Sequence, residues 1–279
     1  MSKTLVLIVS ALVAIVIAPA AHAQSIFPDK NLETVVRRYV FEKRNNDQPL
    51  TEEDVVNIST IQGKGKGVKS LAGMEKCRSL ALLDLEGNEV EDLTPIKDLK
   101  NIQSLTLAKN KIKDLKAIEA LVKLQYLKLD ENQISDLTPL AKLENLRSLY
   151  LSKNQIKDLA PIAGLTKLWS LYLDGNQIEN LAPIANVKNL DSLDLRGNAV
   201  VDLSPIKGLT EWKYLFLDNN KITDISVLSA MGKADKEGPQ RFAPFWNVYL
   251  TGNPLSDEAK KTQLEELKKF AKTVVFETK

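Results

Sequence analysis

Apolar and polar residues follow one another in a fixed order along most of this chain. Residues 146–165, LRSLYLSKNQIKDLAPIAGL, show the whole pattern, which reads L-x-x-L-x-L-x-x-N-x-I-x-D-L-x-P-I-x-x-L. Its central L-x-L alternates with a period of two, which predicts a short strand whose leucines point to one side. The whole pattern has a 22-residue period, as shown by the asparagines Asn88, Asn110, Asn132, Asn154, Asn176, Asn198 and Asn220; Asn253 follows later, after an insertion.

This periodicity predicts the fold. A single coil of this length cannot bury its own leucines, so successive coils must stack and share a core. We therefore predict an α/β fold of the leucine-rich repeat solenoid type. It has a curved, parallel β-sheet on the concave face, short 3-10 or single helical turns on the convex face, and helical caps at both ends.

The polar positions of the pattern have predictable roles in the turns. The asparagine stands where the strand ends, and its amide carries donors and an acceptor for peptide groups that a buried turn leaves unpaired. Stacked coil on coil, the asparagines are expected to form a ladder. Thr or Ser before Pro is expected to cap each helical turn. The aspartate four residues past the asparagine is expected to bond to backbone N–H groups, at Asp92, Asp136, Asp158, Asp202 and Asp224.

Residues 1–23 do not follow the repeat. Lys3 precedes an almost wholly apolar run, Pro19 interrupts this run, and Ala21-His22-Ala23 has the form of a cleavage site. We predict a secretory signal peptide over 1–23. A retained membrane anchor is the alternative, because the run is nearly long enough to span a bilayer. No later apolar run is that long, so no membrane span is expected after cleavage.

The remaining chain divides into an N-terminal cap (24–57), leucine-rich repeats (58–253) and a C-terminal cap (254–279). Helical spacing is expected within 27–44, with Asp29 or Asn31 as N-cap, and Thr51 is expected to cap a second short helix. The last cap is expected to hold an amphipathic helix over 256–272 and a strand over 273–277. An insertion at 231–242 contains charges, glycines and a proline, which predict a mobile exposed loop.

Composition excludes several classes of function. Without Lys3, 37 Lys and Arg residues face 36 Asp and Glu residues, so no charge imbalance points to nucleic acid. The only histidine, His22, lies in the predicted signal peptide, which excludes Ser-His and Cys-His catalysis in the rest of the chain. Cys77 occupies a leucine position and is expected to be buried. We predict no enzyme activity, no metal site and no cofactor.

Residues between the strand leucines point to the side opposite the core. Equivalent residues of neighbouring strands, about 4.8 Å apart, stack into columns. Aromatic residues recur there, and exposed apolar patches rich in Tyr and Trp mark interaction sites. A rim of mixed charges, which suits protein recognition, surrounds them. We predict a protein-binding surface formed by Tyr126, Tyr150, Trp169, Tyr172, Asp194, Tyr214, Phe216, Trp246 and Tyr249.

Three features resemble the internalin-like family of bacterial leucine-rich repeat proteins: the 22-residue frame with DLTPI and DLAPI, the segments FPDKNL, LTEEDV and GMEKCRSLALLDL, and the C-terminal LTGNPLSDEA. The resemblance covers 27–279. It implies a non-enzymatic module whose concave face binds another protein. A carbohydrate or peptidoglycan binder is the alternative. Because Lys279 is reached without a cell-wall sorting motif, we expect a periplasmic or freely secreted protein.

Overall fold

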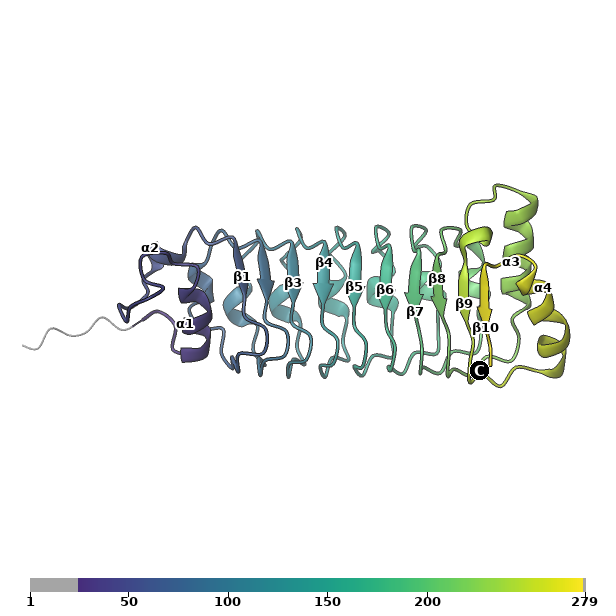
Figure 1. The fold of residues 1–279 in the computed structure, drawn as a ribbon, viewed down its shortest axis with the longest axis horizontal. Coiled ribbons are helices and arrows are strands. Elements are labelled where there is room, and N and C mark those ends of the chain that lie inside the picture. Colours follow the sequence, from purple (N-terminus) through teal and green to yellow (C-terminus); the bar gives the residue numbers. More distant parts are fainter. Residues whose placement is uncertain (1–24, 278–279) are drawn as a thin grey trace, which may run out of the picture.

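The computed structural model describes residues 25–277, which form a stack of coils along one axis (Figure 1). One parallel sheet of ten three-residue strands runs the length of the stack, and the strands pair in chain order. The predicted leucine-rich repeat solenoid is thus confirmed, while the predicted signal peptide lies outside the described residues. The strands are β1 (Thr60–Gln62), β2 (Leu82–Asp84), β3 (Ser104–Thr106), β4 (Tyr126–Lys128), β5 (Ser148–Tyr150), β6 (Ser170–Tyr172), β7 (Ser192–Asp194), β8 (Tyr214–Phe216), β9 (Asn247–Tyr249) and β10 (Thr273–Val275).

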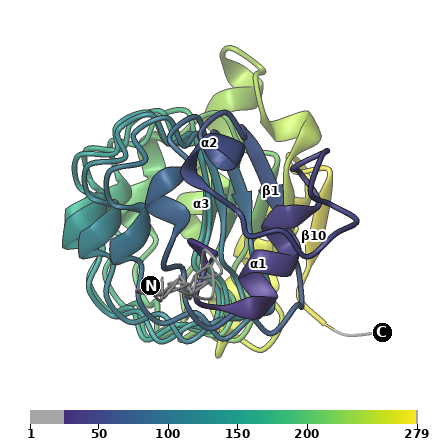
Figure 2. The same ribbon diagram turned by 90° about the vertical axis from the view of Figure 1, so that its left-hand side faces the viewer.

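Short helical segments lie on the side of the stack opposite the sheet (Figure 2). They are 3-10 helices, since a 22-residue coil has little room for more than one turn. In the part of the chain that the structure describes, no helix is both long and apolar enough to cross a membrane. The 3-10 segments on this side are Met74–Lys76, Thr94–Ile96, Lys116–Ile118, Thr138–Leu140, Ala160–Ile162, Ala182–Ile184 and Ser204–Gly208; a further one, Ala243–Phe245, comes directly before β9.

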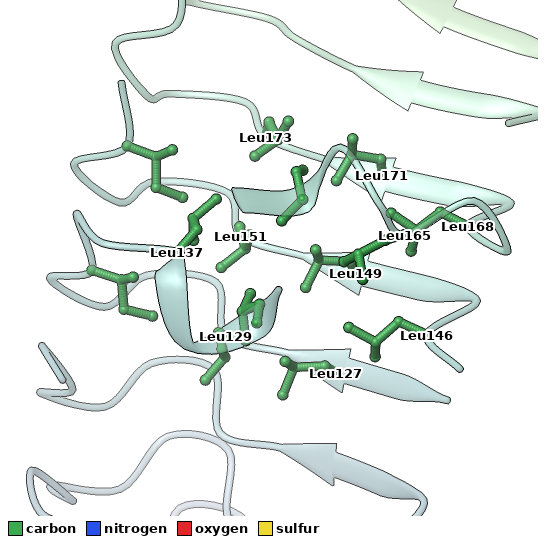
Figure 3. Close-up of a cluster of buried hydrophobic side chains, with 14 of the residues drawn as sticks. Leu127, Leu129, Leu137, Leu146, Leu149, Leu151, Leu165, Leu168, Leu171 and Leu173 are labelled. Atoms are coloured by element: carbon green, nitrogen blue, oxygen red, sulfur yellow. The ribbon is translucent and has the colours of Figure 1, made fainter. Parts of the chain in front are cut away.

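The core lies between the sheet and these helical turns. The middle residue of each repeat strand points inward; Leu127, Leu149 and Leu171 are fully buried and lie above one another (Figure 3). Burying one such leucine contributes about 2 kcal/mol. Cys77 is also buried, as predicted, and burial raises the pKa of its thiol to about 12. The thiol is therefore protonated and unreactive at neutral pH.

The asparagine ladder forms as predicted. The side chain of Asn154 donates to the carbonyls of Leu129 and Leu151, at 3.0 Å each, and accepts the Ile134 N–H at 3.0 Å. Two of these three partners belong to the preceding coil. Each asparagine therefore bonds to its own turn and to the turn before it, and this ties adjacent coils together at a buried place that water does not reach.

The aspartates of the repeat, and not the Thr or Ser residues, cap the helical turns. Asp136 Oδ1 accepts the Thr138 N–H at 2.8 Å, and Thr138 is the first residue of its 3-10 helix. The prediction that Thr or Ser caps these turns was wrong, because the proline is the second helical residue rather than the first. Equivalent N–H bonds are made by Asp92, Asp158, Asp202 and Asp224, as predicted.

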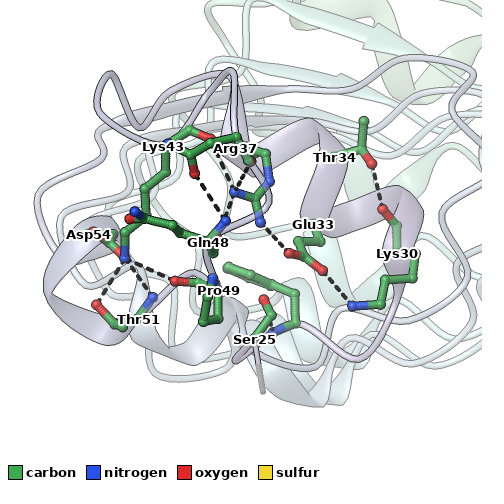
Figure 4. A network of polar contacts seen from close by, with 12 residues as sticks. Ser25, Lys30, Glu33, Thr34, Arg37, Lys43, Gln48, Pro49, Thr51 and Asp54 are labelled. Carbon is green, nitrogen blue, oxygen red and sulfur yellow. Dashed lines mark hydrogen bonds and ion pairs between the residues drawn. The ribbon is translucent and has the colours of Figure 1, made fainter. Parts of the chain in front are cut away.

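Two helices, α1 (Lys30–Arg37) and α2 (Glu52–Val55), cover the N-terminal end of the core. Figure 4 draws polar contacts of these helices and of the segment between them: Arg37 pairs with Glu33 within α1 at 2.5 Å, and Lys43 of the connecting segment pairs with Asp54 of α2 at 2.6 Å. Asp29 caps α1, as predicted. One of its carboxylate oxygens accepts two N–H groups of α1, and the other accepts the Lys69 and Ser70 N–H groups. Asp29 thereby fastens the cap to the first coil.

Lowering the pH should remove the stabilisation that Asp29 gives to this cap. Burial alone would raise the pKa of its carboxyl group, but four backbone N–H donors outweigh burial and lower that pKa. A lowered folded-state pKa stabilises the protein above the pKa of the unfolded chain, about 4, and this is lost as pH falls through the folded-state value. Asp29→Asn should therefore be less stable than the native protein at about pH 6, with the difference shrinking toward about pH 2.5.

Thermal unfolding at a series of pH values measures this difference. Asp98→Asn is the control, because Asp98 is an exposed aspartate at the far side of the coil. A difference between the native protein and Asp29→Asn that stays constant down to the lowest pH would contradict the prediction.

The insertion before the last repeat strand is helical. Helix α3 (Ser226–Glu237) contains its first half, and Met231, Gly232 and Asp235 are buried there. The prediction of a mobile exposed loop was wrong for 231–237, because Gly238 and Pro239 stand after the helix and not within it; residues 238–241 are exposed and lie outside any helix. The carboxylate of Asp235 then accepts the backbone N–H groups of residues 241–243 and holds the segment that follows against the helix.

The C-terminal end is closed by a π-helical turn (Ala259–Gln263), helix α4 (Leu264–Lys268) and strand β10. Leu264 and Leu267 are buried, as the amphipathic pattern predicted. Strand β10 pairs in parallel with β9 and extends the sheet beyond the repeats. The limits of the three segments, 24–57, 58–253 and 254–279, stay a prediction.

Candidate binding face

The outer side of the sheet carries the predicted column of side chains. We call this side the sheet face; it is the face that the sequence predicted to be concave. From β1 to β8 the third residue of each strand pairs in register with the third residue of the next, as the 22-residue spacing requires, and β9 and β10 continue this register. The strand column consists of Gln62, Asp84, Thr106, Lys128, Tyr150, Tyr172, Asp194, Phe216, Tyr249 and Val275.

Six aromatic residues on the sheet face form two stacks. In the first, here called the tyrosine ladder, the Tyr150 ring lies 5.3 Å from the Tyr126 ring and 4.8 Å from the Tyr172 ring. In the second, here called the phenylalanine stack, the Phe216 ring lies 5.9 Å from that of Tyr214 and 4.7 Å from that of Tyr249. Such stacking adds to burial energy and fixes the rings in place. The sheet face therefore presents two rigid aromatic surfaces.

Burial shifts the pKa of two hydroxyl groups in the tyrosine ladder. It raises the pKa of Tyr126 to about 12, with the neighbouring Tyr150 and Asp130 acting in the same direction. It also raises the pKa of Tyr172. Both phenols stay protonated at neutral pH, so the ladder offers O–H donors together with ring edges. An open groove of about 390 Å³ passes over Tyr126, Tyr150 and Tyr172.

Asp194 separates the two stacks, and it is fully buried. The guanidinium of Arg196 covers its carboxylate with contacts of 2.9 Å from Nε and 2.5 Å from Nη2. Burial raises the pKa of Asp194, and Arg196 opposes this shift. The same guanidinium lies 5.1 Å from the Phe216 ring. The expectation that Asp194 itself lies on the surface was wrong, because Arg196 is the group exposed at this position.

Arg196 was not among the binding residues predicted from the sequence. An Asp-x-Arg spacing in a strand places both side chains on one face, so the pair was visible in the sequence in principle. The closing of the guanidinium over the carboxylate depends on Asp194 being the small residue between two aromatic neighbours, Tyr172 and Phe216.

The two predicted tryptophans take opposite positions. Trp169 is exposed (52 %), and Arg147 lies 5.8 Å from its ring. Trp246 is fully buried, with the Phe242 ring edge-on at 5.2 Å, so the expectation that it lies on or beside the sheet face was wrong. The last repeat coil has one residue fewer before its strand. Trp246 N–H bonds to the carbonyl three residues back, as Leu168 does, and Trp246 therefore takes the inward leucine position.

A second line of side chains borders the strand column, two residues beyond the last residue of each strand. We call it the row; it comprises Asp130, Ser152, Asp174, Arg196 and Asp218. Asp130 and Asp218 each accept a backbone N–H at 2.9 Å, from Ser152 and Thr251. Burial raises the pKa of Asp130, and the charge of Asp174 adds to that effect. Within residues 25–277, no group of three His, Cys, Asp or Glu side chains is placed to hold a metal ion.

Comparison with known proteins identifies the family of this repeat. Residues 100–142, 144–186 and 188–230 match a family model described as leucine-rich repeats in two copies. The crystal structure of internalin C2 from Listeria monocytogenes is 37 % identical, with a TM-score of 0.71, and the match covers 74 % of this chain and 91 % of that one. The chain belongs to the internalin-like family of leucine-rich repeat proteins.

More distant structures share the fold of this internalin-like chain. A leucine-rich repeat protein of Leptospira interrogans is 25 % identical with a TM-score of 0.57, over 73 % of this chain and 56 % of that one. The ectodomain of a plant receptor kinase from Arabidopsis thaliana, solved in complex with Casparian strip integrity factor 2, is 22 % identical with a TM-score of 0.58. That match covers 66 % of this chain and 24 % of the receptor. No curated protein sequence matches the chain significantly.

Proposed function

We propose that this internalin-like protein is an exported, non-enzymatic module that binds a protein partner on its sheet face. The observation that carries the proposal is the pair of aromatic stacks on one exposed side of a rigid sheet. Tyr and Trp dominate the energetics of protein interfaces, and a preformed surface loses little entropy when a partner docks. The residues we propose for binding are Tyr126, Tyr150, Trp169, Tyr172, Tyr214, Phe216 and Tyr249, with Arg196 in place of Asp194.

Two further points support a protein partner. The plant receptor ectodomain with the same fold was solved with a bound factor. In addition, the Tyr150 ring lies between the Tyr172 ring, stacked on it at 4.8 Å, and the Tyr126 ring, tilted by 43° at 5.3 Å, so neighbouring rings partly cover its faces. A sugar ring stacks on an open face, whereas a protein surface contacts edges and hydroxyls equally well. We propose export to the periplasm or the medium on the basis of residues 1–23.

Removing the aromatic surface should abolish capture of the partner. The variant Tyr150→Ala, Tyr172→Ala, Phe216→Ala and Tyr249→Ala should lose at least about 100-fold in affinity, since truncated interface anchors each cost about 2 kcal/mol or more. The immobilised native protein and this variant are exposed to envelope and secreted fractions, and retained proteins are identified by mass spectrometry. Circular dichroism first checks that the variant is folded.

The control is Phe41→Ala, which removes an exposed aromatic ring from the N-terminal cap. A protein retained by the native and control proteins and lost from the fourfold variant supports the sheet face. Equal retention by all three would place binding elsewhere. If the native protein retains no protein at all, the protein-binding proposal fails and glycans are tested next.

A further inference from the structure

The two central lines of the sheet face carry an excess of negative charge. From strand β4 to strand β9, the strand column and the row contain four aspartates, Asp130, Asp174, Asp194 and Asp218, and two cations, Lys128 and Arg196. Both cations are already paired, Lys128 with Glu86 at 3.4 Å and Arg196 with Asp194 at 2.5 Å. The lysines at the margin, Lys109 and Lys153, both approach Glu131. The other three aspartates have no cation within ion-pair distance among the described residues.

These three aspartates stand in a regular line. Asp130, Asp174 and Asp218 occupy the same position in alternate coils, so neighbouring ones lie two strand spacings apart, or about 9.6 Å. Asp130 and Asp218 keep an N–H donor from the backbone, and the Asp174 carboxylate has no hydrogen-bond or ion-pair partner among residues 25–277. Burial raises the pKa of Asp130, and the charge of Asp174 adds to that effect, as expected for two like charges on one line. Cations from outside would relieve the repulsion between these charges.

The spacing of these three aspartates matches the repeat of one backbone conformation that a bound peptide can adopt. A polyproline II segment has three residues per turn and rises about 3.1 Å per residue, so every third side chain points the same way about 9.3 Å apart. A β-strand instead returns to the same side every two residues, about 6.7 Å apart. Only the first of these repeats matches the line of aspartates. In a bound peptide of this conformation with a basic residue at every third position, the apolar residues between the basic residues would contact the tyrosine ladder and the phenylalanine stack, which lie beside the row.

We propose that the partner presents an extended basic segment, with Arg or Lys at every third residue, which lies along the solenoid axis and pairs with Asp130, Asp174 and Asp218. This inference rests on the proposed function and specifies the chemistry of its partner. Long basic side chains reach the carboxylates while their stems cover the aromatic edges. Electrostatic complementarity of this kind chooses between partners and sets their register.

Peptides of equal composition test the spacing. The probe is a fluorescent nonapeptide of three Arg-Pro-Pro units, and its matched control contains the same residues with the three arginines adjacent. The periodic peptide should bind the protein about tenfold more tightly than the control, because three charge-assisted contacts form together only at the matching spacing. Fluorescence anisotropy at low and high salt measures both affinities. Equal affinity for the two peptides, or binding to neither, overturns the inference.

Variants of the protein test the residues. Asp130→Asn, Asp174→Asn and Asp218→Asn combined should weaken binding of the periodic peptide about tenfold and remove most of its salt dependence. Asparagine keeps an acceptor for the Ser152 and Thr251 N–H groups, so the fold is preserved. The control combines Asp98→Asn, Glu144→Gln and Glu179→Gln, three exposed acidic residues outside the column and row. Equal loss in the two triple variants overturns the inference.

The two proposals fail separately. A partner whose capture depends on the aromatic residues but not on the three aspartates leaves the proposed function in place and overturns the basic segment. Failure of the native protein to capture any partner overturns the proposed function itself.

Discussion

Replacing Gly73 with alanine should destabilise the protein by about 4 kcal/mol, through steric overlap and backbone strain together. Gly73 has φ = 97°, a left-handed conformation that residues with a Cβ adopt at a cost. A Cβ there would also lie 2.5 Å from the Ile26 carbonyl oxygen and 2.7 Å from Phe27 Cδ1. Phe27 is fully buried, so neither neighbour can move away without opening the N-terminal end of the core.

Urea unfolding of native and variant protein measures this loss. The matched control is Gly164→Ala, because a Cβ at Gly164 meets no atom within 4 Å and the backbone there is not left-handed. That substitution should be neutral or stabilise by up to about 1 kcal/mol, since it restricts the unfolded chain. If the two glycine variants unfold at the same urea concentration, the close approach of residues 26–27 to Gly73 is not a constraint in solution.

Replacing Asn154 with alanine should cost about 3 kcal/mol, because it leaves a buried N–H unpaired and removes two buried hydrogen bonds. The unpaired donor is the Ile134 N–H, whose acceptor is Asn154 Oδ1. The two carbonyls lose less. Leu129 still accepts from Asn132, and Leu151 still accepts from Asn176, since each carbonyl serves two rungs of the ladder.

The neighbouring Gln155→Ala is the control for this variant. It removes a side-chain amide of the same kind from an exposed position one residue away, so its effect should stay within about 0.5 kcal/mol. The measurement is urea unfolding followed by circular dichroism. A small effect of Asn154→Ala would mean that water enters the turn and replaces the amide. The asparagine ladder would then determine the shape of each coil without stabilising the fold.

The candidate binding face follows from these same turns. The asparagine ladder and the leucine core hold each coil at a fixed spacing from the next. Residues one period apart in the sequence therefore stack on the surface. Tyr150 and Tyr172 meet at 4.8 Å for this reason. Destabilising the asparagine ladder should therefore loosen the aromatic stacks, even though none of its asparagines lies on the sheet face.

Much of this arrangement was predictable because the repeat fixes the register. The 22-residue period determined the solenoid, the inward leucines, the asparagine ladder and the strand column. These features need only the alternation of a strand and the requirement that buried peptide groups be paired. The membership of Tyr126, Tyr150, Tyr172, Phe216 and Tyr249 in two lines of the sheet face followed from counting alone.

The tertiary structure decided what departs from the period. Trp246 turned inward because the last repeat coil has one residue fewer before its strand, and a shift of one residue reverses the face to which a side chain points. Asp194 became buried because Arg196 closed over it, which depends on the space between Tyr172 and Phe216. Residues 226–237 became a helix because the core accepts Leu228 and Met231 on one side. A repeat determines its own register, whereas exceptions to it are determined by what they pack against.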